Sequence, residues 1–168
     1  MMTTIKGEHE TMVNECVEAV ANAMGEAVES ANVVWMIIMS KYDNEFGNVP
    51  PRLVEYMSKA MDLAFADPWN LRGMTAAKEK AEPPHDDIER DSIDLIWHQS
   101  MKWTSASLKS YAMMHDVHYD LVAQLAESDP TKLAKLQKEL SKAAHAARAQ
   151  LQGVQALRQL LAQSCNSG

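Results

Sequence analysis

Apolar residues recur along the first part of the chain at alternating gaps of four and three. This spacing places them on one helix face, in the seven-residue repeat that helices use to pack together. The positions of this first apolar seam are Val13, Val17, Val20, Met24, Ala27, Ala31, Val34 and Ile38. We predict one long helix over residues 8–44, with its seam covered by other helices. Gly25 interrupts it at a cost of about 1 kcal/mol, which we interpret as a place where another helix approaches closely.

The same alternation returns over residues 131–163. The positions of this second apolar seam are Leu133, Leu136, Leu140, Ala143, Ala147, Gln150, Val154, Leu157 and Leu161. Only Gln150 is polar, so this segment also predicts a long helix. Ser128 or Asp129 can cap its start, and Pro130 suits the first turn, where a missing N–H costs nothing.

Two more helices are predicted between these segments, over residues 51–66 and 88–126. Pro51 suits the start of the former, and Asp87 is the predicted N-cap of the latter. Residues 71–81 are compatible with a short extra helix, and residues 82–87 with an exposed connector. The expected fold class is all-α. We expect a single domain, residues 1–168, forming an elongated bundle or coiled coil of about four helices with a C-terminal helical hairpin.

Charge is unevenly distributed along the chain. The formal net charge is −7, which argues against nucleic acid as a partner because phosphate neutralisation needs surplus Lys and Arg. Residues 1–48 hold two basic and eight acidic residues, whereas residues 131–168 hold six basic and one acidic. The two long terminal helices are therefore expected to pair, within one chain or between chains. The alternative is two solvated faces that never meet.

The best candidates for contact with a partner are the seam residues and the aromatic residues of the middle helix. Met and Trp are frequent in surfaces that bind other proteins. The partner we expect is a second copy of the chain or another helical protein, with peripheral contact to a hydrophobic surface as an alternative. The candidate interaction residues are Val34, Trp35, Ile38, Trp97, Trp103, Tyr111, Leu133, Leu136, Leu140, Val154, Leu157 and Leu161.

No pattern of residues indicates catalysis or a cofactor, and we expect neither catalytic nor cofactor-binding nor metal-binding residues. Asp94, His98, His115 and His118 form the one arrangement that suggests a metalloenzyme, because two His three residues apart share a helix face. The predicted helices carry neither the Glu-x-x-His motif of helical-bundle metal sites nor a His-Glu-x-x-His motif. We interpret Cys16 as a small core residue.

Residues 90–150 carry a more specific pattern. A helix with Trp97 and Trp103 leads into Ser-Asp-Pro at residues 128–130. The next helix carries Leu133-Ala134, Gln137, Leu140-Ser141 and Ala149-Gln150. This arrangement resembles the helical hairpin of type III secretion needle and inner-rod subunits in spacing and arm length. Such subunits are exported without a cleaved signal and polymerise helically, so the resemblance implies self-assembly and export.

The chain also departs from that family. Ala143–Ala147 stands in place of its aromatic and Asn-rich stretch, Glu127 replaces the first Pro of its turn, and residues 1–85 have no counterpart in a needle subunit. Residues 49–57 and the helices around them are similar in layout to the filament proteins of the same secretion systems. The Asp-Pro turn before a helix rich in Ala, Leu and Gln is equally similar to phasins, the coat proteins of polyester granules.

The function expected from these patterns is a non-enzymatic helical assembly or interaction protein, of the secretion filament or needle type. The alternatives are a phasin-like protein of granule or lipid surfaces and an acidic helical inhibitor or immunity protein. The N-terminus lacks the apolar stretch of a secretory signal peptide. No apolar run is long enough for a transmembrane helix. We therefore expect a cytoplasmic protein, with signal-independent export left open.

Overall fold

The chain folds into helices alone over the residues that the structure describes, which confirms the all-α class. The computed structural model describes the backbone of residues 2–166 and the side chains of residues 7–152 and 154–161. Its elements are α1 (Met2–Lys41), the 3-10 turn η1 (Phe46–Asn48), α2 (Pro51–Ala66), α3 (Leu71–Ala81), α4 (Asp87–Leu125) and α5 (Pro130–Asn166). The short helix at residues 71–81, which the sequence left open, is therefore present.

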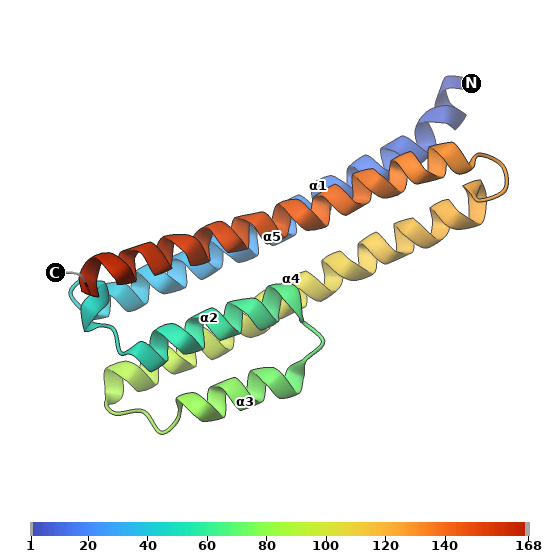
Figure 1. The fold of residues 1–168 in the computed structure, drawn as a ribbon. Helices are drawn as coiled ribbons and strands as arrows, with labels where there is room; N and C mark the ends of the chain where they lie inside the picture. The colour runs from blue at the N-terminus through green and yellow to red at the C-terminus, as the bar shows by residue number, and fades with distance from the viewer. Residues whose placement is uncertain (1, 167–168) are drawn as a thin grey trace.

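Three long helices, α1, α4 and α5, run alongside one another and set the elongated shape (Figure 1). Helices α1 and α5 point in the same direction, and α4 runs opposite to both. The shorter helices α2 and α3 form a hairpin beside one end of these rods, where α1 ends and α4 begins. A tight turn joins α4 to α5 at the opposite end, as expected for the C-terminal hairpin.

Local backbone chemistry sets the helix ends. Helix α1 stops at Lys41 and not at residue 44, because Asp43 and Asn44 adopt left-handed φ angles of 57° and 55°. Acidic and amide side chains tolerate this conformation, but it cannot continue a right-handed helix. At the start of α4, the side chain of Asp86 accepts a hydrogen bond from the Glu89 amide at 2.8 Å. Asp86 and not Asp87 is thus the N-cap.

Two other helix starts follow from the same chemistry. Asp129 accepts a hydrogen bond from the Lys132 amide at 3.1 Å and so caps α5, with Pro130 as its first residue. Ser128, the other predicted cap, instead donates to the Gln124 carbonyl. Asn70 caps α3 by accepting from the Gly73 amide at 2.8 Å. This cap explains how a helix forms in a segment that has no clear apolar repeat.

The first apolar seam is buried, as its spacing predicts. Helix α1 packs against α4 and α5 along its length. Val17 is partly buried, and the remaining seam positions are buried: Val13, Val20, Met24, Ala27, Ala31, Val34 and Ile38. Cys16 lies in the same core, where burial raises the pKa of its thiol. It is the small core residue that the sequence indicated, whereas Cys165 lies outside the described side chains.

The second apolar seam is buried only in part. From Leu136 to Ala147 it packs into the core, but the buried line then continues through Leu151, Val154 and Arg158. The prediction that Leu157 and Leu161 belong to this line is wrong, since both side chains are exposed. A straight α-helix turns by about 20° per heptad relative to a strict seven-residue repeat. Over the three heptads from Leu133 to Val154 this drift reaches about 60°, more than half of the roughly 100° between successive residues. The buried line therefore moves forward by one residue.

Helix α4 packs through small hydroxyl side chains more than the sequence indicated. Ser92, Ser100, Thr104, Ser107 and Ser110 are all buried along its inner faces. Three of them satisfy their hydroxyls within the helix, as Thr104 does by donating to the Ser100 carbonyl at 2.8 Å. Short side chains let α1 and α2 approach α4 closely from two sides. The spacing of apolar residues could not reveal this face, because the face consists of Ser and Thr.

Large aromatic residues fill the space between α2 and α4. The rings of Phe65 and Trp103 are stacked, with centroids 6.1 Å apart. The Trp103 indole N–H donates to the Ser30 hydroxyl at 3.0 Å, which joins α4 to α1. Trp103 is therefore both an apolar anchor and a polar link across the core.

We predict that Gly25→Ala stabilises the protein. A Cβ built at Gly25 meets no atom within 4 Å, so the expected close approach of another helix at this position is wrong. Alanine restores helix propensity, and the free energy of unfolding should rise by about 0.5–1 kcal/mol in urea denaturation. The control is Gly73→Ala, where the new Cβ lies 2.6 Å from the capping Asn70 side chain. A loss of stability in Gly25→Ala would contradict the open environment.

Candidate functional site

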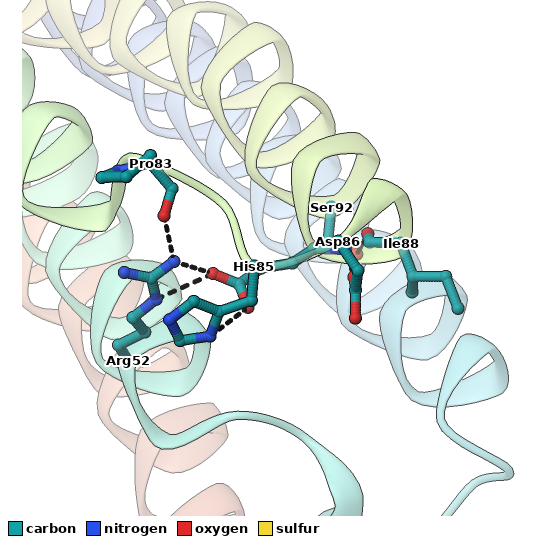
Figure 2. Close-up of polar contacts among 7 residues, drawn as sticks. Arg52, Pro83, His85, Asp86, Ile88 and Ser92 are labelled. Carbon is teal, nitrogen blue, oxygen red and sulfur yellow. Dashed lines mark hydrogen bonds and ion pairs between the residues drawn. The ribbon is translucent and has the colours of Figure 1, made fainter.

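A buried carboxylate joins the start of α4 to α2 (Figure 2). Glu89 is buried, and it accepts a hydrogen bond from Arg52 Nε at 2.7 Å and a second from Arg52 Nη2. Arg52 also donates to the Pro83 carbonyl. His85 Nδ1 lies 3.4 Å from the second carboxylate oxygen of Glu89. The cluster thus links α2, the connector before α4 and the first turn of α4.

The chemistry of this cluster is that of a structural clasp. Both oxygens of the Glu89 carboxylate face positive or hydrogen-bonding groups, so neither is free to take a proton from a substrate. A buried charge without a partner costs several kcal/mol, so this pairing stabilises the fold. The sequence did not single out this cluster, because Arg52 and Glu89 belong to helices that it could not place side by side.

A hollow of about 570 Å³ lies between α2 and α3. Arg52, Lys59 and Asp62 line it from α2, and Gly73 and Lys80 line it from α3. Its rim carries both signs of charge, and Lys80 bridges it by donating to Glu55 at 3.0 Å. At one wall, burial strongly raises the pKa of the Tyr56 hydroxyl, so this group stays protonated and cannot act as a base.

The residues considered for a metal do not come together. His98 and His115 are seventeen residues apart on the single helix α4, which corresponds to about 25 Å along its axis. His118 contacts Gln137 at 2.7 Å, and His115 lies 3.8 Å from Asp116. Over the described part of the chain, no three His, Cys, Asp or Glu side chains are placed to hold a metal ion.

The structure separates the predicted interaction residues into three groups. Six are buried in the core and cannot meet a partner without unfolding: Val34, Trp35, Ile38, Trp103, Leu136 and Leu140. Four are partly buried: Trp97, Tyr111, Leu133 and Val154. Two are exposed: Leu157 and Leu161. Only the last group presents a large apolar side chain to the surface.

Two of the partly buried residues, Trp97 and Tyr111, have defined local partners. Lys78 Nζ lies 4.7 Å from the ring centroid of Trp97, and the Trp69 and Tyr111 ring centroids are 5.1 Å apart. Arg148 donates to the Tyr111 hydroxyl at 3.3 Å. Trp97 and Tyr111 are therefore engaged within the chain.

The oppositely charged helices do pair within one chain. Helices α1 and α5 lie side by side, and Lys132 contacts Glu10 at 3.3 Å near the start of both. Near the other end, the Arg158 guanidinium lies 5.8 Å from the ring centroid of Trp35. Because α1 and α5 are parallel and make contacts near both ends, they lie side by side without a large shift along their axes. Most of the acidic face of α1 and the basic face of α5 nevertheless remains in solvent.

Arg158 is the least satisfied group in the core. Its side chain is buried, and its three nitrogens have no hydrogen-bond partner in the described part of the chain. Burial lowers the pKa of the guanidinium, an effect that nearby Asp62 opposes. Asp62 itself accepts a hydrogen bond from Gln155. The drift of the buried line on α5 has thus brought a charge into the core where the heptad pattern would have placed a leucine.

The displaced leucines form a surface that we call the leucine patch: Leu157, Leu160 and Leu161. Their exposed fractions are 59%, 60% and 42%. At the same end of the rods, α1 exposes Val33, Met36 and Ile37. The predicted interaction residues include Leu157 and Leu161 but not Leu160, Val33, Met36 or Ile37. The sequence sign of such exposed residues is a helix segment that is apolar on nearly all sides. Its neighbouring helices in the bundle cannot cover all of these sides.

We predict that Arg52→Met costs about 3 kcal/mol of unfolding free energy, because it leaves the buried Glu89 carboxylate without its main partner. The double variant Arg52→Met/Glu89→Leu should recover most of the loss. The matched control is Arg90→Met, which breaks only an exposed ion pair with Asp87 and should cost under about 1 kcal/mol. Urea denaturation measures all three. Equal losses for Arg52→Met and Arg90→Met would refute the clasp.

We also predict that Arg158→Met stabilises the chain by about 1–4 kcal/mol, since an unpaired buried charge is removed and the volume is kept. This gain outweighs the loss of its contact with Trp35, which contributes about 1–2 kcal/mol. The control is Arg148→Met, which removes an exposed arginine that donates to the Tyr111 hydroxyl. Thermal and urea unfolding measure the stability of both variants against wild type. If Arg158→Met is less stable than wild type, the guanidinium makes a net stabilising contact and the prediction is wrong.

Comparison with known proteins gives no match, whether to a family model, to a curated protein or to a solved structure. The similarities to type III secretion subunits and to phasins therefore stay predictions from residue patterns. No described helix has both the length and the apolar character needed to cross a bilayer. The function must be inferred from the surfaces that the fold leaves open.

Proposed function

We propose that this protein is a non-enzymatic assembly protein that associates with further copies of itself through its helix faces. The observation that carries the proposal is the leucine patch. Leucine is rarely exposed in groups on one helix face unless that face meets another surface. On α5 the three leucines lie next to the residues that the same helix buries in the core. Patches of this kind are typical of helices that are covered in an assembly.

The energetics are adequate for association. Full burial of one leucine side chain contributes about 1.5–3 kcal/mol relative to full exposure. Covering three partly exposed leucines therefore contributes several kcal/mol toward the roughly 8 kcal/mol of a micromolar complex. Contacts of the remaining interface and the entropy lost on association determine the balance.

A subunit of a secretion filament or needle is the specific form of this proposal. It is supported by the resemblance of residues 90–150 to needle and inner-rod subunits and by the long hairpin of α4 and α5. Long parallel helices suit polymerisation, because each subunit can make the same contact with the next.

We predict that the purified protein exceeds its monomer mass of 18.7 kDa as concentration rises. Size-exclusion chromatography with light scattering measures this. The variant Leu157→Glu/Leu160→Glu should stay monomeric, because charges cannot be buried in the contact. Leu71→Glu is a matched control, since Leu71 is also 60% exposed but lies on α3. A wild-type protein that stays at 18.7 kDa at millimolar concentration would contradict self-assembly.

A further inference from the structure

Helix α1 presents an exposed face whose chemistry changes along its length. We call it the α1 stripe: Glu15, Glu18, Glu26, Glu29, Val33, Met36 and Ile37. Gaps of three, four and eight residues keep these side chains on one face. The first four are acidic and the last three are apolar, and residues 7–40 contain no Lys or Arg. The stripe thus runs from negative to apolar.

Helix α5 presents a matching exposed face. We call it the α5 stripe: Lys135, Lys138, Lys142, Ala146, Ala149, Leu157 and Leu160. It runs from positive through small apolar residues to two of the leucines of the patch. Glu139 is the one acidic group beside it, and Lys142 contacts that carboxylate at 3.0 Å. Even with Glu139 included, the lysine end carries net positive charge.

The two stripes match at their charged and apolar ends, but the acidic part of the α1 stripe extends further. Glu26 and Glu29 lie level with residues 148–152 of α5, beyond Lys142. Since α1 and α5 are parallel and level, from the Glu10–Lys132 contact to the Trp35–Arg158 contact, the charged parts lie toward one end and the apolar parts toward the other. Glu15 is about level with Lys138, and Glu18 with Lys142. Val33 is about level with Leu157.

A hollow beside the α1 stripe can receive apolar side chains. It has a volume of about 360 Å³ and lies between α1 and α4. Val33 and Ile37 line it from α1, and Leu95 and Gln99 line it from α4. Glu26 and Glu29 border it on the α1 side. An incoming leucine from a helix parallel to α1 would meet apolar side chains here.

From these observations we propose that the α5 stripe of one copy docks on the α1 stripe of a second copy, with the helices parallel and without axial shift. Glu15 and Glu18 then face Lys138 and Lys142, and Leu157 and Leu160 face Val33, Met36 and the hollow. Glu26 and Glu29 lie near the alanine part of the α5 stripe. This inference rests on the proposed self-assembly and names its interface. Opposite charge over one part and apolar contact over the other specify both the direction and the register.

The interface is heterologous, because two different faces of the chain meet. A pair of copies joined this way leaves one free α1 stripe and one free α5 stripe. Further copies can therefore add at both ends, which produces a ring if the rotation closes and an open filament if it does not. An isologous α5–α5 contact would instead stop at a dimer and would set lysine against lysine in a parallel arrangement.

A complementation experiment tests this interface. The variant Val33→Glu/Met36→Glu disables the α1 stripe, and Leu157→Glu/Leu160→Glu disables the α5 stripe. All four positions are exposed, so both variants should keep the wild-type circular dichroism. Each variant alone should be monomeric in light scattering. Their equimolar mixture should form a 1:1 dimer of twice the monomer mass and no larger species, since one intact face remains on each partner.

The outcomes separate this proposal from the one on which it rests. If wild type stays monomeric, self-assembly itself fails. If wild type assembles but Val33→Glu/Met36→Glu assembles equally well, or the mixture stays monomeric, self-assembly stands and the α1–α5 interface is wrong. Leu71→Glu should behave as wild type in every mixture.

A charge reversal provides a second test that does not touch the apolar residues. Glu15→Lys/Glu18→Lys and Lys138→Glu/Lys142→Glu should each weaken association at least tenfold at low salt, because like charges then face each other. A chain that carries all four changes should associate as wild type does. Failure of the fourfold variant to recover, with its fold intact, would overturn the proposed register.

Discussion

The constraint on which this structure depends is the mismatch between a straight α-helix and a seven-residue repeat. Three long helices can stay packed only if each keeps an apolar face toward the others, and a straight helix moves such a face by about 20° per heptad. In α1 a wide band of apolar residues absorbs the drift, so every seam position is buried apart from the partly buried Val17. In α5 the band is narrower. The buried line there passes from Ala147 to Leu151 and reaches Arg158, while Leu157 turns outward.

The second organising element is the end of the bundle where α2 and α3 pack. The Arg52–Glu89 pair connects α2 to the first turn of α4, and the hydroxyl face of α4 lets both α1 and α2 approach. Trp103 connects the two sides by stacking on Phe65 and donating to Ser30. These contacts hold together segments that are far apart in the chain, and they leave the outer faces of α1 and α5 without a role in folding.

Those outer faces carry the functional proposal. Apolar side chains on both helices are exposed at the same end of the rods, and charges of opposite sign occupy the other end of each face. Of the twelve residues that the sequence suggested for partner contact, the fold buries six and partly buries four. The proposed contact surface therefore lies on the faces beside the apolar seams. A surface of this kind suits a repeating contact between like subunits.

The sequence alone determined the all-α class, the positions of the long helices and most of the α1 core, because each depends on local spacing and on helix-start residues such as Pro51 and Pro130. It also indicated that α1 and α5 pair, since their charges are opposite. Tertiary structure alone decided that Glu89 meets Arg52, that serines form the packing face of α4, and that Arg158 and not Leu157 enters the core. These outcomes depend on which helices become neighbours and on how each is rotated about its axis. Side-chain periodicity within one helix contains neither quantity.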